Sequence, residues 1–213
     1  MTSSRRDFVK QSAVAATGSW LSGARVHGWL KADEAAAAEA GSESQGGWYD
    51  RPMRWAQLAF VEDDPGNYDP QFWLDYFRGV HADAACLSAG GVVAFYPTEL
   101  PLQKRSAWLG ERDAFGDLAA GCRRMGMNVV ARTDSHACWQ KVYDAHPDWI
   151  MVDAKGEKRR HASDPQYWLT CALGPYNFEC MTQVHEEIMR KYRPDGSSQT
   201  GGRAAGCATA SIA

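Results

Sequence analysis

The sequence has 213 residues, and its 23 lysine and arginine residues against 26 aspartate and glutamate residues give a formal net charge of −3. Charges of both signs are mixed along the chain without a basic stripe, which argues against a nucleic-acid partner. The six cysteines are scattered, and their spacing matches no small disulfide framework. We expect the first five to be core thiols: Cys86, Cys122, Cys138, Cys171 and Cys180.

The N-terminal ten residues read MTSSRRDFVK and contain a candidate export motif. The residues Arg5, Arg6, Phe8 and Lys10 resemble the leader of the twin-arginine (Tat) pathway, S-R-R-x-F-x-K, which a receptor reads as an address. The following stretch, 11–30, is too polar for a stable membrane span. The sequence therefore predicts a periplasmic or extracellular protein whose first partner is the Tat translocation machinery. The alternative is a basic N-terminus that arose by chance.

The end of this leader has two candidate positions. Small residues suit cleavage after Ala24, and they suit it again after Ala40, where A-E-A precedes the polar stretch GSESQGG. The second position is favoured, which predicts a disordered signal peptide over residues 1–40 and a linker over residues 41–47.

From residue 54 onward the pattern alternates between strands and helices. Short apolar runs predict strands over 54–60, 84–88 and 127–131, and amphipathic stretches predict helices over 71–80, 115–125 and 178–192. Such alternation is typical of parallel βαβ units. In the first helix, one buried face is expected to hold Phe72, Trp73, Tyr76, Phe77 and Val80.

The connections between these elements differ in length. The segments after the second and third strands, 89–114 and 132–177, are long, whereas the turns from helix to strand are tight. In (β/α) barrels the loops that follow the strands form the face that holds the active site. We therefore expect a functional site on that face.

Several segments between Trp48 and Gly196 resemble one family of glycosyl hydrolase-like barrels, related in pattern to α-L-fucosidases and to β-galactosidases with a trimerisation domain. The segments are WYDRPMRWAQLAF, DPQFWLDYFR, VVARTDSHA, HPDWIMVDAKG, CALGPYNFE and KYRPDG. The resemblance implies the N-terminal part of a (β/α)8 TIM barrel, incomplete at about three βα units over residues 48–196. It also implies that the parent enzymes act on carbohydrate glycosidic bonds.

The residues after Gly196 depart from the family pattern, in which an Asp-Gly pair introduces the fourth strand. Here the chain reads SSQTGGRAAGCATASIA, without a strand or helix pattern. A shifted reading of the same codons permits LFSNRWAGCGMCYCKHC, which would supply the strand and a thiol cluster of the kind that holds zinc. We therefore expect residues 197–213 to be an irregular, frameshifted tail, and this fragment to be inactive and without a cofactor.

Glycosidases need two carboxylates that flank the scissile bond. The preferred catalytic residue is Asp134, because it follows the third strand within Arg132-Thr133-Asp134-Ser135-His136. A buried ion pair between Arg132 and Asp134 that holds the top of the barrel is an equally good interpretation. Other candidate carboxylates are Glu99 and Glu111 in the second long loop and Glu62, Asp63 and Asp64 after the first strand. The candidate substrate-binding residues are Arg132, His136, Glu99, Trp108 and Trp139.

Two other function classes remain open. A metal-dependent sugar isomerase or epimerase would need acidic and histidine ligands at successive strand ends, and only Asp134 and His136 approach that pattern. No metal ligands are therefore assigned. A non-catalytic carbohydrate-binding protein would keep the aromatic residues without a carboxylate pair. His185, on the last helix, is expected at the surface.

Overall fold

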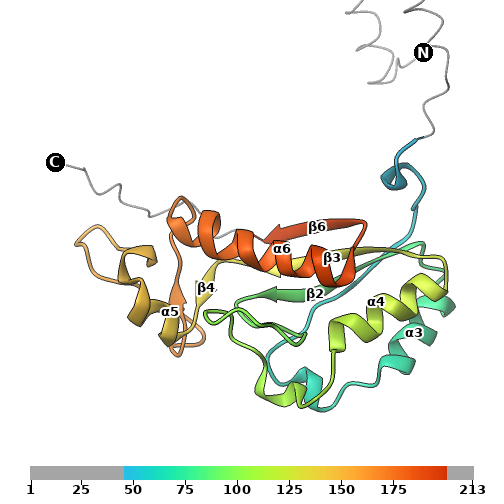
Figure 1. Cartoon of the computed structure of the whole chain (residues 1–213), viewed down its shortest axis with the longest axis horizontal. Coiled ribbons are helices and arrows are strands. Elements are labelled where there is room, and N and C mark those ends of the chain that lie inside the picture. The colour runs from blue at the N-terminus through green and yellow to red at the C-terminus, as the bar shows by residue number, and fades with distance from the viewer. Residues whose placement is uncertain (1–45, 201–213) are drawn as a thin grey trace, which may run out of the picture. The chain divides into compact units, whose positions relative to one another are not determined.

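A computed structural model of the chain describes residues 46–200 (Figure 1). The predicted leader, 1–40, nearly all of the linker, and residues 201–213 of the predicted tail lie outside the described residues. Within the described part, no helix is long and apolar enough to cross a membrane.

Four parallel strands form the main sheet in the order β1-β2-β3-β6. The strands are β1 (Trp55–Leu58), β2 (Ala84–Gly91), β3 (Asn128–Asp134) and β6 (Gly196–Thr200). In register, Leu58 of β1 is the partner of Leu87 of β2, and Leu87 is the partner of Ala131 of β3. The predicted succession of parallel βα units is confirmed.

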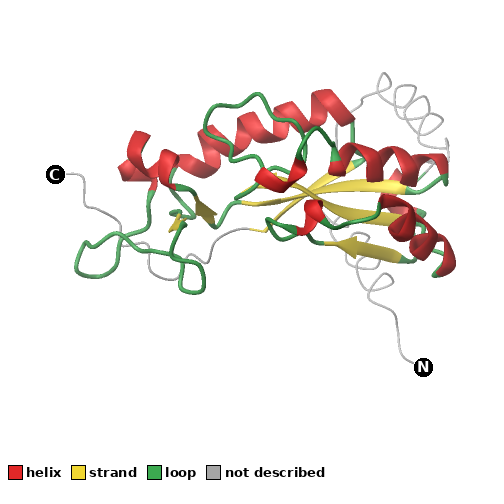
Figure 2. Ribbon diagram, turned by 90° about the horizontal axis from the view of Figure 1, so that it is seen from below, coloured by secondary structure: helices red, strands yellow, loops and turns green. Residues whose placement is uncertain are grey.

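Three helices lie along one face of this sheet: α3 (Pro70–Gly79), α4 (Ala114–Arg124) and α6 (Met181–Tyr192) (Figure 2). The first two begin at aspartate caps, because the carboxylate of Asp69 accepts a hydrogen bond from Gln71 N and that of Asp113 accepts one from Gly116 N. Helix α4 ends before Gly126, whose φ of 76° is a left-handed conformation that suits glycine.

The core lies between the helices and one face of the sheet. Side chains alternate along a strand, so Leu87 and Ala89 of β2 and Val129 of β3 point toward the helices, where they meet residues such as Phe115 and Ile188. Burial of each large apolar side chain contributes about 1.5–3 kcal/mol to folding. The opposite face carries Cys86 and Ser88 of β2 and Val130 and Arg132 of β3.

The face of α3 differs from the predicted one. Leu74 and Phe77 are buried, whereas Phe72, Tyr76 and Val80 are exposed. The reason lies in α4, where Gly121 lets α3 approach so closely that a β-carbon there would lie 2.4 Å from Leu74 Cδ1. The contact between the helices is thus set by a small residue on the neighbour, which the periodicity of α3 alone does not reveal.

The tail also differs from its prediction at its first residues. Residues 197–200 are not irregular, because they belong to β6, whose five residues pair in parallel with β3 from Val130 to Asp134. Backbone N–H and C=O groups at the edge of β3 make these bonds whatever the side chains are. An apolar alternation is therefore not required for this strand.

The segment between β3 and α6 contains small elements that the sequence pattern did not predict. They are β4 (Ala137–Cys138), α5 (Gln140–Ala145) and β5 (Trp168–Leu169), and β4 pairs with β5 in antiparallel fashion. Short 3-10 turns occur at Trp48–Asp50, Asp64–Gly66, Ala107–Leu109 and Pro147–Trp149, and a π turn at Tyr176–Cys180 precedes α6. Elements this short are held by tertiary packing, such as the Tyr143 ring stacked 4.0 Å from that of Trp168.

Candidate functional site

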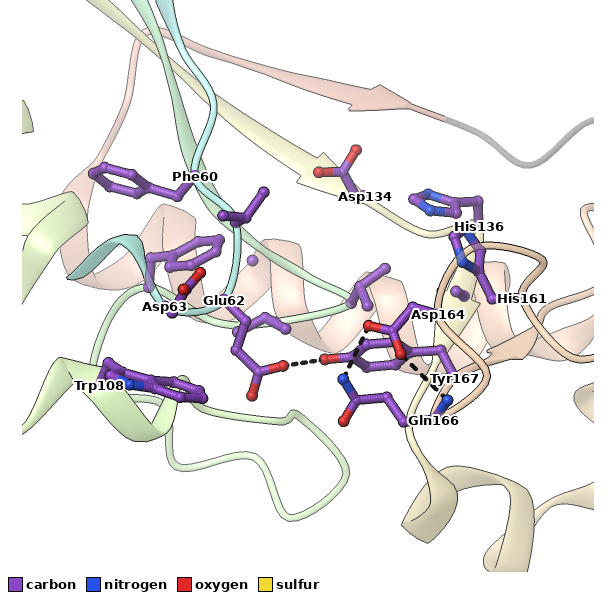
Figure 3. Close-up of a pocket in the computed structure, with 16 residues that line it drawn as sticks. Phe60, Glu62, Asp63, Trp108, Asp134, His136, His161, Asp164, Gln166 and Tyr167 are labelled. Atoms are coloured by element: carbon purple, nitrogen blue, oxygen red, sulfur yellow. Dashed lines mark hydrogen bonds between the residues drawn. The ribbon is translucent and has the colours of Figure 1, made fainter. Parts of the chain in front are cut away.

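A cavity of about 450 Å³ lies at the carboxyl ends of the first three strands (Figure 3). This volume falls within the usual range for small-molecule sites, about 300–1,000 Å³. Its walls come from the segments that follow β1, β2 and β3, together with the stretch 161–167. The lining residues combine apolar side chains (Phe60, Val61, Val92, Val93, Phe95, Trp108, Ala137 and Tyr167) with polar ones (Glu62, Asp63, Asp134, His136, His161, Asp164 and Gln166) and Gly90.

The end of β2 is shaped to meet Asp134. The register between β2 and β3 shifts between Ser88 and Gly90, and Gly91 pairs with Asp134. Gly91 has a φ of 108°, and a β-carbon there would lie 1.9 Å from Asp134 O. Only glycine fits this position, so the close approach of the two strand ends depends on it.

Asp134 is held by its neighbours at the carboxyl end of β3. Its Oδ1 accepts a hydrogen bond from Arg132 Nη2 at 2.9 Å and another from the hydroxyl of Thr200. Arg132 also donates to Ser88 Oγ at 3.3 Å. Among the described residues, no hydrogen bond occupies Asp134 Oδ2. The ion pair therefore exists, and it orients a carboxylate that still lines the cavity.

A second carboxylate in the wall, Glu62, is fully engaged. Lys104 Nζ lies 2.7 Å from Glu62 Oε1, and the hydroxyl of Tyr167 donates to Glu62 Oε2. Lys104 also donates to the Tyr167 hydroxyl at 2.8 Å. Burial raises the pKa of Tyr167, and its hydrogen bond to Glu62 raises it further, so the phenol remains a donor. This triad joins three loops that are distant in sequence.

Two histidines lie together at the cavity wall. The ring centroids of His136 and His161 are 5.6 Å apart. Burial lowers the pKa of His136, the charges of His161 and Arg132 lower it further, and Asp134 opposes this shift. At neutral pH His136 is therefore an uncharged imidazole with one donor and one acceptor, which suits it to hydroxyl groups.

The structure brings together some of the predicted site residues. Asp134, His136 and Trp108 line the cavity, and so do Glu62 and Asp63. Arg132 acts through Asp134. Sequence reasoning missed Lys104, His161, Asp164, Gln166 and Tyr167, because these residues occur in no recognisable spacing and meet only in space.

Other predicted residues lie elsewhere. Glu99 is exposed near α6, with its carboxylate 3.8 Å from Lys191 Nζ. Trp139 donates its indole N–H to Leu102 O at 2.8 Å and packs against the core. Glu99 and Trp139 are thus not part of the cavity wall.

Three more side chains lie outside the cavity wall. Glu111 is exposed and lies outside the wall, and Asp64 accepts a hydrogen bond from Val61 N at 2.7 Å within its own turn. The expectation for His185 is wrong: it is half-buried, with its Nε2 2.9 Å from Thr133 Oγ1. The reason is that it lies on the side of α6 that faces β3.

Comparison with known proteins gives one family match. The model of the family described as hypothetical glycosyl hydrolase 6 matches residues 70–198, which is more than half of the chain. None of the curated proteins matches the sequence.

A solved structure shows a similar fold. The alpha-L-fucosidase isoenzyme 2 from Paenibacillus thiaminolyticus aligns with a TM-score of 0.58 at 20% identity, over 73% of this chain and 24% of that one. The alpha-fucosidase of Thermotoga maritima aligns with a TM-score of 0.43 at 22% identity, over 63% of this chain and 29% of that one. This chain therefore spans about a quarter of the length of the first of these enzymes, and it shares that part of its fold.

Proposed function

Because the chain belongs to the hypothetical glycosyl hydrolase 6 family, we propose that its cavity binds a sugar unit of a glycoside and that Asp134 acts on the glycosidic bond. The observation that supports this most directly is the position of Asp134. It lies at a strand end of a (β/α) sheet, where barrel enzymes place catalytic groups, and its carboxylate lines the cavity beside two histidines.

Glycosidase carboxylates act either as a proton donor or as a nucleophile or base, and the contacts of Asp134 favour the second role. A carboxylate that is paired with a guanidinium fits a nucleophile or base better than a proton donor. His136 and His161 then donate and accept hydrogen bonds with sugar hydroxyls, and the apolar wall of Phe60 and Phe95 contacts the ring carbons.

The second carboxylate of the pair is not Glu62, because Lys104 and Tyr167 engage both of its oxygens. We propose that the proton donor comes from further barrel strands, since a (β/α)8 barrel closes only when eight strands pair. On the basis of residues 197–213 we also propose a frameshift near Gly196, and sequencing the gene across that codon tests it.

A non-catalytic carbohydrate-binding protein is the second candidate, and the engaged state of Glu62 favours it. A metal-dependent isomerase has less support. Among residues 46–200, no group of three or more His, Cys, Asp or Glu side chains could hold a metal ion. We also propose export by the Tat pathway, on the basis of Arg5 and Arg6.

Sugar binding by the purified chain tests the proposal. We expect saturation-transfer NMR with a panel of methyl and aryl glycosides to detect at least one ligand, and Asp134→Ala to remove its signal. The matched control is Asp83→Ala, which also breaks an Arg–Asp pair, between Arg54 and Asp83 at the opposite end of the sheet. The proposal is wrong if no glycoside binds, or if both variants lose binding equally.

A further inference from the structure

We propose that the cavity has a second sugar subsite at its Trp108 end, and that the ligand class is therefore a disaccharide or longer oligosaccharide. This inference rests on the proposed function. Figure 3 shows Trp108 at one end of the cavity and His136 and His161 at the other, with Glu62 between them. A ligand that reaches both ends must be longer than the sugar unit that contacts Asp134.

The backbone of Trp108 is held by the protein, and its indole remains open to solvent. Ser106 Oγ accepts a hydrogen bond from Trp108 N at 3.2 Å and donates one to Glu62 O at 2.6 Å. The next residue, Leu109, is fully buried. The side chain of Trp108 is nevertheless 49% exposed. These contacts hold the backbone that carries the indole, so less conformational entropy is lost when a ligand binds than at a mobile loop.

One side of the indole has support from the protein. Gly66 of the Asp64–Gly66 turn lies so near that a β-carbon would be 3.1 Å from Trp108 Cδ1. The glycine lets the two turns pack closely, and about half of Trp108 remains exposed. The C–H face of a pyranose is apolar and stacks on such a ring, while its hydroxyls stay free to form hydrogen bonds.

Polar groups for those hydroxyls are available at the same end. Asp63 lines the cavity, and its carboxylate has no hydrogen bond or cation partner among the described residues. The indole N–H of Trp108 likewise has no acceptor within the described part of the chain. A stacking surface with one acceptor and one donor is what a sugar subsite requires.

Three matched pairs of sugars test the subsite: D-glucose with cellobiose, D-galactose with lactose, and L-fucose with 2′-fucosyllactose. Dissociation constants are measured by isothermal titration calorimetry on the whole chain. We expect the longer sugar of at least one pair to bind about tenfold more tightly than its monosaccharide, the gain that one stacked ring supplies. Trp108→Ala should remove this gain and leave the monosaccharide unchanged, whereas Trp108→Phe should keep most of it.

The control variant is Trp55→Ala. Trp55 is 48% exposed, which matches Trp108, but it begins β1 and so lies at the opposite end of the sheet. Loss of the Trp55 side chain should change neither the affinity for the monosaccharide nor the affinity for the longer sugar. Equal affinities within every pair, or a Trp108→Ala effect of the same size on both members, would overturn the subsite and leave the proposed function intact. If no sugar binds at all, both proposals are wrong.

Discussion

Asp134 and Arg132 illustrate what one pair of residues does at this strand end. The guanidinium orients the carboxylate, and the carboxylate faces the cavity, so the pair is both structural and available for chemistry. The two interpretations of the Arg-x-Asp pattern therefore do not exclude each other. Which of them matters for function is decided by kinetics.

In a family member that contains the whole barrel, we expect the substitution equivalent to Asp134→Asn to lower kcat for an aryl glycoside by at least about a hundredfold, because the neutral amide cannot act as nucleophile or base. Steady-state rates and thermal unfolding are measured together. The equivalent of Asp83→Asn should leave kcat within about twofold, as its carboxylate is remote from the cavity. A loss of folding without a specific loss of rate would contradict a catalytic Asp134.

We expect the Glu62 triad to contribute more to the free energy of unfolding than any other polar contact of the cavity wall. Lys104→Met should lower the free energy of unfolding by about 3 kcal/mol, because it leaves Glu62 largely buried without its cation. Tyr167→Phe removes one hydrogen bond to that carboxylate and should cost about 1–2 kcal/mol. Urea denaturation measures both.

The comparison for this triad is Arg54→Met, which breaks an exposed ion pair with Asp83. It should cost less than about 1 kcal/mol, since exposed pairs contribute little. Similar losses for Lys104→Met and Arg54→Met would show that the Glu62 triad is not a buried anchor.

His136 makes stability depend on pH. Its pKa in the folded protein is below the ordinary value of 6.5, so at acid pH the unfolded chain takes up a proton that the folded chain resists. The free energy of unfolding should therefore fall as pH drops below about 6.5, and this fall should be smaller in His136→Asn. Urea unfolding of both proteins at about pH 7 and pH 5 measures the difference. If the free energy of unfolding changed with pH equally in the two proteins, the lowered pKa of His136 would be contradicted. The nearby charged groups, Asp134, Arg132 and His161, are the same in both proteins.

At the level of elements, the contact between α3 and α4 depends on a missing side chain. Gly121→Ala should destabilise the protein by about 1–2 kcal/mol, although alanine is the better helix former, because the added methyl group meets Leu74. Gly79→Ala is the matched change at the end of α3, where a β-carbon would meet no atom within 4 Å. It should be neutral or stabilising, and thermal unfolding distinguishes the two. Stabilisation by both changes would mean that the helices separate easily.

At the scale of the whole molecule, the proposed export depends on the arginine pair of the N-terminal leader. Replacement of both Arg5 and Arg6 by lysine should keep a reporter fused after Gly47 in the cytoplasm, because the receptor reads the arginine pair. Cell fractionation of the two reporter fusions measures this. Substitution of Arg51 and Arg54 by lysine in a longer fusion serves as the control and should not change export. Export of the Arg5 and Arg6 variant at the normal level would rule out the Tat pathway.

The sequence by itself determined the succession of parallel βα units, the family and the end of the sheet that holds the cavity, because these depend on local periodicity, on contiguous motifs and on connection lengths. It placed Asp134, His136 and Trp108 at the end of the sheet where the cavity lies. Only the tertiary structure decided which side chains share one cavity and which face of α3 is buried.

The physical reason is that such contacts join distant segments. Lys104 lies 42 residues after Glu62 along the chain, and Tyr167 lies 105 residues after it. No local pattern encodes the contact between these three residues. Likewise, β6 forms because the edge of β3 is open for pairing, and the side chains of β6 show no strand pattern that predicts it. Local patterns specify elements, whereas complementary packing between elements specifies the site.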